Sequence, residues 1–194
     1  MRLPRLIAAF VLAAGPALAA PAPAPATDAD LPAARKAWEK RDLKALEGWR
    51  DRFAGHALEA YPAYWHLSTT LEKADPAAIR AFLSRHADTP LAEPLRRDWL
   101  KLLGAAGRWG DFRLEYPLVA SDDTEVACYA LQERLARGDA AALKEARALW
   151  LEGREAPAAC TPPFEAAAAE RLIGPPEAWE RIRRLLAAGL VAEA

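Results

Sequence analysis

The chain has 194 residues, enough for one domain of ordinary size, and 53% of them are hydrophobic, which excludes a wholly disordered chain. Much of this share is alanine, the residue with the highest helix propensity, whereas the strand-favouring valine and isoleucine are scarce. The composition therefore predicts an all-α protein. The formal net charge is -1 and no long basic run is present, which argues against nucleic acid as a partner because phosphate binding requires a basic face.

Residues 1–20 have the pattern of a cleaved export signal. Arg2 and Arg5 give a positive start, an apolar run covers residues 6–14, and an A-x-A motif ends at Ala19. We expect cleavage between Ala19 and Ala20. A membrane anchor is the alternative, but the apolar run is short and a Gly-Pro pair interrupts it. The pattern predicts an exported protein of a bacterial periplasm, with no stable membrane insertion after cleavage.

Residues 21–30 follow the expected cleavage site and read PAPAPATDAD. Alternating proline and alanine cannot form a helix and favour the polyproline II conformation. We interpret this segment as a flexible linker that leads into the folded domain, which we expect to cover residues 31–194.

Cys128 and Cys160 are the two cysteines of the chain. In an oxidising compartment such as the periplasm, a pair of cysteines predicts a disulfide. Two buried free thiols are the alternative. Metal binding is less favoured, because neither cysteine has a second cysteine or a histidine at ligand spacing.

From residue 31 onward, apolar residues at helical spacing alternate with helix start and stop signals. The first helices are expected at about residues 31–40, from Asp42 to the Gly-His pair at 55–56, and at about 57–73. The next starts are expected at Asp75-Pro76, Thr89-Pro90 and Trp109. The last four are expected after Asp122, which would form a capping box with Glu125, after Asp139, at Thr161-Pro162 and after Gly174-Pro175.

Ten such helices make about five helical hairpins. Aspartates at positions 42, 75, 111 and 139 are expected to cap the second helix of successive pairs, at intervals near the length of a two-helix repeat. This pattern predicts a right-handed α-superhelix, a degenerate solenoid similar to tetratricopeptide repeats. The last helix lacks a clear polar cap, so we expect the solenoid to be partial, truncated at its C-terminal end, with an exposed apolar face around Trp179, Ile182 and Leu186.

The sequence offers no catalytic, cofactor-binding or metal-binding pattern. His56, His66 and His86 are too far apart for a zinc helix and are interpreted as surface or helix-end residues. No G-x-S-x-G motif is present, and the glycine-rich stretch 104–110 joins two helices rather than a strand and a helix. We therefore predict no cofactor and no metal.

Carboxylates and tryptophans are plentiful but can be explained without chemistry. We expect Glu39, Glu47, Glu93, Glu145 and Glu152 on solvated helix faces or caps. Five tryptophans fit apolar helix stripes and are expected in the core: Trp38, Trp49, Trp99, Trp150 and Trp179. Trp65 and Trp109, with Tyr61 and Tyr64, could instead line a concave surface and stack on sugar rings.

Five segments in order resemble one family. They are residues 34–49 (ARKAWEKRDLKALEGW), 56–65, 89–112, 128–164 and 179–189, and the likeness is strongest between the two cysteines and the Pro/Phe helix start that follows them. Together they resemble the N-terminal superhelical arm of soluble lytic murein transglycosylases of Gram-negative bacteria. The resemblance covers nearly all of the chain after the predicted signal.

The resemblance implies a non-catalytic role for this stretch. In that family, a separate C-terminal lysozyme-like domain cleaves the MurNAc–GlcNAc bond of peptidoglycan, with one glutamate as acid and then base. That domain carries a Glu-Ser pair and a later Gly-Leu-Met-Gln, and this sequence contains neither. We therefore expect an arm that lacks its catalytic domain, is inactive alone and meets peptidoglycan through the full-length enzyme. The alternative is a stand-alone periplasmic helical-repeat scaffold that binds a partner.

Overall fold

The computed structural model describes residues 24–194, so the predicted signal and its cleavage residues, Ala19 and Ala20, lie outside the described part. Within that part the chain forms ten α-helices, four short 3-10 helices and no strand, which confirms the predicted all-α fold. The α-helices are α1 (Leu31–Glu39), α2 (Leu43–Arg52), α3 (Ala60–Thr70), α4 (Pro76–Arg85), α5 (Ala92–Ala105), α6 (Trp109–Glu115), α7 (Thr124–Ala136), α8 (Ala141–Trp150), α9 (Thr161–Ala169) and α10 (Pro175–Ala187). The 3-10 helices are η1 (Asp28–Asp30), η2 (Tyr116–Leu118), η3 (Ala158–Cys160) and η4 (Val191–Glu193).

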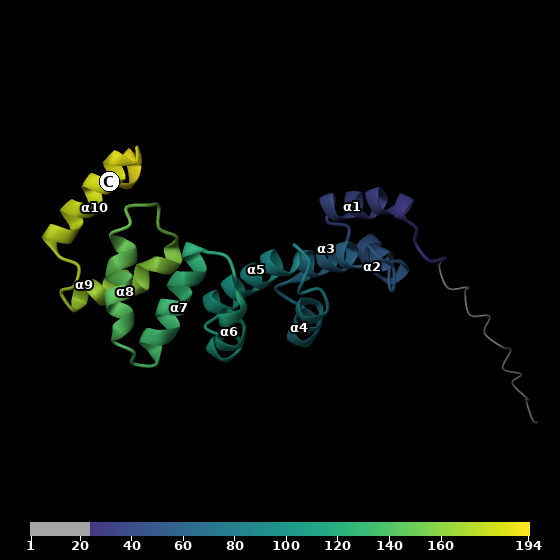
Figure 1. Ribbon diagram of the computed structural model, residues 1–194, viewed down its shortest axis with the longest axis horizontal. Helices are drawn as coiled ribbons and strands as arrows, with labels where there is room; N and C mark the ends of the chain where they lie inside the picture. Colours follow the sequence, from purple (N-terminus) through teal and green to yellow (C-terminus); the bar gives the residue numbers. More distant parts are fainter. Residues whose placement is uncertain (1–23) are drawn as a thin grey trace, which may run out of the picture.

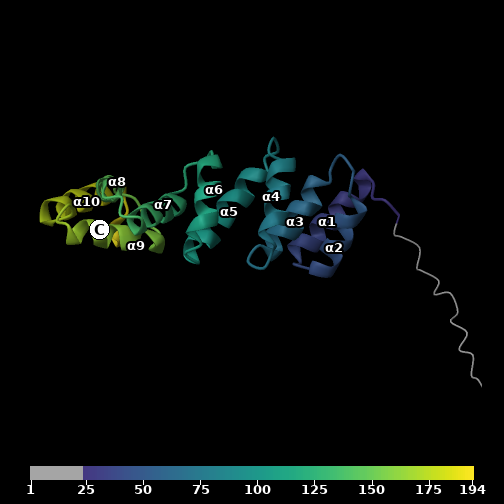
Figure 2. The same cartoon turned by 90° about the horizontal axis from the view of Figure 1, so that it is seen from below.

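The helices follow one another along an elongated molecule, with α1–α3 near one end and α8–α10 at the other (Figures 1 and 2). Most helices pack on the next one along the chain, and α1 also meets α3, α5 meets α7 and α7 meets α9. Contacts restricted to near neighbours are the mark of a solenoid. The structure therefore has the predicted architecture of stacked helical hairpins.

The hydrophobic core is correspondingly divided along the chain. One cluster joins α1–α3 around Leu46 and Phe53, a second joins α3–α7 around Leu95 and Leu100, and a third joins α7–α9 around Cys128. Each hairpin buries its apolar face against its neighbours rather than in one common centre. Stability of any one joint then depends on the residues at that joint.

Four aspartates start helices by accepting a hydrogen bond from a free backbone N–H of the first turn. Asp42 accepts from Ala45, Asp75 from Ala77, Asp123 from Val126 and Asp139 from Ala141. Asp42 and Asp75 fulfil the capping role predicted for them, whereas Asp139 lies one residue before Ala140, the N-cap residue of α8. These caps satisfy donors that helix ends otherwise leave to water.

Several predicted boundaries differ from the structure. Asp111 lies inside α6, where it pairs with Arg80 and Arg108, and it caps no helix. The cap of α7 is Asp123 and not Asp122, one residue further along the chain. Helix α5 begins at Ala92, because the Thr89 hydroxyl donates to the backbone of the preceding turn and does not cap.

The expected long helix at residues 57–73 is also shorter. Turns occupy residues 53–59, and α3 begins only at Ala60. The backbone N–H of Gly55 donates to the Glu59 carboxylate at 2.7 Å. This hydrogen bond stabilises the turn that precedes α3.

The described part of the predicted linker is attached to the fold. Ala26 is buried, and its N–H donates to the carbonyl of Arg52 at 2.9 Å. Arg52 Nε in turn donates to the carbonyl of Ala24. Residues 24–27 therefore lie along the end of α2, and the next three form η1, which differs from a flexible leader. The domain boundaries drawn from the sequence stay a prediction.

Candidate functional site

A groove with a volume of about 840 Å³ lies beside α3. Its walls come from the turn between α1 and α2, from the last turn of α3 with the residues after it, and from α5. Two aromatic rings line it, Trp38 and Tyr64, together with the hydroxyl residues Ser68, Thr69 and Thr70. Charged side chains of both signs complete the lining.

The aromatic lining is held in place by stacking. The Trp38 ring lies 5.8 Å from the ring of Trp65 at an interplanar angle of 14°, and Trp65 is buried. Tyr64, one position earlier on α3, packs 6.5 Å from the ring of Phe82 on α4. Burial raises the pKa of the Tyr64 hydroxyl, with the negative charge of Asp98 as a second cause. The phenol is therefore a neutral donor or acceptor at physiological pH.

The hydroxyl groups on α3 donate to carbonyls of their own helix. Thr69 Oγ1 donates to the carbonyl of Trp65 at 2.7 Å and Thr70 Oγ1 to that of His66 at 2.8 Å. Their oxygens keep lone pairs that can accept a bond from a ligand. This face of α3 thus presents acceptors at the groove.

The structure separates the aromatic residues differently from the sequence prediction. Trp65 and Trp109 were the candidates for sugar stacking, but Trp65 is buried beneath Trp38 and Trp109 packs edge-on against Phe112. Trp38, expected in the core, is half-buried and lines the groove with Tyr64. Trp179, also expected in the core, is 63% exposed. The helical pattern could not separate these positions, because an exposed ring and a buried ring occupy the same kind of stripe.

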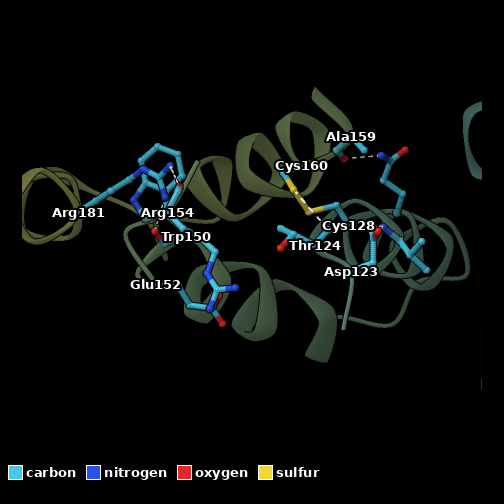
Figure 3. Close-up of a disulfide and its surroundings, with 11 residues drawn as sticks. Asp123, Thr124, Cys128, Trp150, Glu152, Arg154, Ala159, Cys160 and Arg181 are labelled. Atoms are coloured by element: carbon cyan, nitrogen blue, oxygen red, sulfur yellow. Dashed lines mark hydrogen bonds and ion pairs between the residues drawn. A yellow bond between two sulfur atoms is a disulfide. The ribbon is translucent and has the colours of Figure 1, made fainter. Parts of the chain in front are cut away.

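The predicted face at the end of the chain is present. Trp179 and Leu186 are exposed on α10, whereas the buried positions of that helix are Leu185 and Arg181. Arg181 lies under the helix because its guanidinium donates to the carbonyls of Trp150 at 2.6 Å and Arg154 at 3.0 Å (Figure 3). It also stacks 4.3 Å from the centre of the Trp150 ring, so an arginine occupies the place expected for an apolar residue.

Cys128 and Cys160 form a disulfide between α7 and η3, with Cα atoms 4.8 Å apart (Figure 3). Both cysteines are fully buried. Gln132, one turn further along α7, donates to the carbonyl of Ala159 at 2.6 Å and ties the same two segments together. The bond is part of the core between α7 and α9, and it presents no reactive thiol.

The five glutamates assigned to solvated faces all have partners in the structure. Glu39 pairs with Arg35, Glu47 with Arg50, Glu145 with Arg134 and Glu152 with Arg154. Glu93 accepts from the backbone of Ala120 and Ser121 and from the Ser121 hydroxyl, so it holds the segment before α7.

Two buried carboxylates were missed by the sequence analysis. Glu115 is 5% exposed and lies between Arg80 and Arg96, and Glu133 is 4% exposed and lies between Arg113 and Arg137. The partners Arg80 and Arg96 of Glu115, and Arg113 of Glu133, come from other helices, which no local pattern reveals, whereas Arg137 is an i,i+4 neighbour of Glu133.

None of the carboxyls with a shifted pKa in residues 24–194 has the properties of a general acid. A catalytic acid must hold its proton near neutral pH, which requires a raised pKa. In residues 24–194, every carboxyl whose pKa is shifted has it lowered, as Arg80 does for Asp111. The described part of the chain therefore stabilises carboxylates in their charged form.

The histidines are likewise dispersed. His56 Nδ1 accepts from the N–H of Leu58, His86 packs 4.7 Å from the Phe82 ring, and burial lowers the pKa of His66. Across residues 24–194 no group of three or more His, Cys, Asp or Glu side chains is placed to hold a metal ion. No helix in the same range has the length and apolar content needed to cross a membrane.

Comparisons with known proteins find similarity among solved structures. The chain is similar to an inactive mutant of the lytic transglycosylase Slt of Pseudomonas aeruginosa, with 28% identity and a TM-score of 0.71 over 84% of this chain and 26% of that one. It is also similar to the 70 kDa soluble lytic transglycosylase of Escherichia coli, with 23% identity and a TM-score of 0.70 over 84% of this chain and 27% of that one. The structure of the 70 kDa soluble lytic transglycosylase in complex with bulgecin A gives 22% identity and the same TM-score over 83% and 26% of the two chains.

No protein-family model and no curated protein matches the chain. The structural matches confirm the helical superhelix fold, and the first of them supports relationship beyond the fold. The chain spans about a quarter of the length of these solved structures. The chain is therefore similar in fold, and at 28% identity in sequence, to part of a lytic transglycosylase.

Proposed function

We propose that this chain is the non-catalytic superhelical arm of a periplasmic soluble lytic transglycosylase that takes part in peptidoglycan cleavage and cell-wall turnover. The observation that carries the proposal is the 28% identity over 84% of this chain, matched to 26% of a lytic transglycosylase. The arm would position a catalytic domain on the MurNAc–GlcNAc strand and would supply no acid or base itself.

The electrostatics of the helices support this division of labour. The buried carboxylates Glu115 and Glu133 each form ion pairs with two arginines. These pairs stabilise the packing of the hairpins. In this proposal the cleavage step belongs to a separate lysozyme-like domain.

The size of the native polypeptide tests the proposal. An antibody raised against residues 24–194 should detect, in the periplasmic fraction of the cells that produce the protein, a polypeptide several times larger than 21.1 kDa. A cytoplasmic enzyme serves as the control for fractionation. A periplasmic species of 21.1 kDa or slightly less would support the alternative of a stand-alone scaffold, and a cytoplasmic location would overturn both.

A further inference from the structure

We propose that α10 is a hinged helix, held in a closed position by a clamp that Arg181 and Arg184 form on the end of α8. When the clamp opens, α10 rotates away as a unit while the body made of α7, α8 and α9 stays folded. This motion is a property of the fold and does not depend on the function proposed for the chain.

Helix α10 is attached to the body with little apolar contact. None of its residues belongs to the hydrophobic clusters of residues 24–194, and its closest packing is against η4, which follows it in the chain. Leu185 is its one buried apolar residue. The helix lies at the edge of the stack (Figure 1), whereas α8 and α9 pack on each other within one cluster. The attachment of α10 therefore depends on polar contacts.

The two clamp arginines supply these contacts by donating to backbone carbonyls at the C-terminal end of α8. The Arg181 guanidinium donates to the carbonyls of Trp150 and Arg154 (Figure 3), and Arg184 donates to the carbonyl of Leu151. Carbonyls at a helix C-terminus lack partners within the helix and carry partial negative charge, which favours a cation there. The closed position of α10 is thus fixed by hydrogen bonds from its own side chains.

The closed clamp also contains groups that burial destabilises. Arg181 is 8% exposed, and it has no ion pair among the described residues. Its charge is stabilised instead by the carbonyls and by the Trp150 ring beneath it. The indole N–H of Trp150 is buried without a protein acceptor. Burial of unpaired polar groups opposes closure, so α10 should open at a lower free energy than the body unfolds.

The chain provides a pivot at Gly174, directly before α10. Leu172 and Ile173 pack against the α7–α9 cluster, so the chain is anchored to the body up to this point. A Cβ at Gly174 would meet only Glu177 and Pro176 of the same turn, so the body does not obstruct rotation there. The two prolines that follow fix the first turn of the helix. Rotation at the pivot therefore moves α10 as a rigid unit.

The loop after α8 is shaped for a close approach of α10. Gly153 has a φ of 65°, and a Cβ built there would lie 2.4 Å from the Cβ of Arg184 and 3.3 Å from its carbonyl carbon. A larger residue at this position must therefore displace α10. Gly138 offers a comparison, since it follows α7 with a φ of 81° and a Cβ there would meet nothing within 4 Å.

Hydrogen exchange of the full chain, followed by mass spectrometry of peptides from α7, α9 and α10, tests the hinge. We expect α10 of the wild type to exchange at least about tenfold faster than α7 and α9, because it opens without global unfolding. Arg181→Gln should raise the exchange of α10 by about another tenfold, the effect of losing hydrogen bonds from a charged group, and leave α7 and α9 unchanged.

Arg183→Gln is the matched control for the clamp. Arg183 is exposed on the same helix, and its ion pair is with Glu180 of α10 itself, so its loss should leave the exchange of all three helices unchanged. Equal exchange of α7, α9 and α10 in the wild type would overturn the hinge. A joint rise in all three helices in Arg181→Gln, or no rise in α10, would also overturn it.

Gly153→Ala tests the hinge without removing an arginine. Both Gly153→Ala and Gly138→Ala place alanine at a positive φ, but only the first substitution pushes against α10. Faster exchange of α10 in Gly153→Ala alone supports the clamp. Equal effects of the two substitutions on α10 would contradict it, because they would show that α10 responds to the loss of overall stability and not to its own contacts.

Discussion

Two neighbouring interfaces between helices of the solenoid, called joints below, are stabilised by different interactions. The joint between α4, α5 and α6 rests on ion pairs: Arg80 Nε lies 3.0 Å from a Glu115 oxygen, and Arg96 Nε lies 3.7 Å from the other. The joint between α7 and α9 rests on the Cys128–Cys160 disulfide. The first depends on charge and therefore on pH, whereas the second depends on the redox state of the compartment.

The comparison shows why a linear stack needs such local devices. Each hairpin contacts only its neighbours, so each interface between hairpins is stabilised only by its own residues and not by a common core. The cluster that joins α7–α9 contains four alanines and the two cysteines beside Leu131 and Phe164. The cluster around α4–α6 has more large apolar residues, such as Leu95 and Phe112, and ion pairs at its edge. The covalent bond therefore lies in the cluster that has the larger share of small side chains.

Removing the disulfide is the largest expected effect. The double variant Cys128→Ser, Cys160→Ser opens a loop with a sequence separation of 32, which should lower the free energy of unfolding by about 3.7 kcal/mol. Urea unfolding followed by circular dichroism measures this loss. Reduction of the wild type should reproduce it, and a change of less than about 1 kcal/mol would show that the joint is held by packing alone.

Breaking the ion-pair joint should cost less. Glu115→Gln keeps the size of the side chain but leaves Arg80 and Arg96 without their shared carboxylate, and we expect a loss of about 2 kcal/mol because both arginines keep other partners. The control is Glu39→Gln, which removes an exposed pair and should change stability by no more than about 0.5 kcal/mol. Equal effects of the two substitutions would contradict a role for burial.

The pH dependence of stability should also distinguish the two joints. The Arg80 guanidinium is the main cause that holds the pKa of Asp111 below its usual value of 3.8, against the opposing effect of burial. A lowered folded-state pKa gives stability that is fully present above the unfolded pKa and is lost as the pH falls through the lower folded pKa. Stability should therefore decrease below about pH 4, and Asp111→Asn should flatten this decrease. A pH profile that the substitution leaves unaltered would contradict the assignment.

Substitution of the exposed ring on α10 is the smallest expected effect. Trp179 is 63% exposed, so Trp179→Ser removes little buried area, and the free energy of unfolding should change by no more than about 0.5 kcal/mol. Analytical ultracentrifugation of the same variant should show weaker self-association if this apolar face mediates contacts between copies. A large loss of stability would place the ring in the core, as the helical pattern first suggested.

Helix types and start signals were predictable from the sequence because they depend on local chemistry. Asp42 and Asp75 cap helices where predicted, and the glycine at 138 follows the end of α7 with a positive φ of 81°. The Asp122 and Asp123 pair could not be separated, because two adjacent aspartates offer the same carboxylate. Only the backbone conformation decides which of the two reaches a free N–H.

Features that join distant turns escaped prediction for a physical reason. Glu115 and Arg80 meet across 35 positions, and Trp38 meets Trp65 only because α1 and α3 cross. The groove is formed by residues of α1, α3 and α5 that are distant in sequence. The sequence pattern therefore predicted only whether each residue is buried or exposed, and not that they line one groove. Tyr64 was the exception, since its place in an aromatic-rich helix already suggested a concave surface.

We propose that this chain supports glycan cleavage without performing it. The most direct measurement is incubation of the purified protein with murein sacculi, followed by mass spectrometry of the soluble fraction. We predict that no 1,6-anhydromuropeptides are released, while an active lytic transglycosylase added to the same sacculi releases them. Release of anhydromuropeptides by the purified chain would contradict a non-catalytic role.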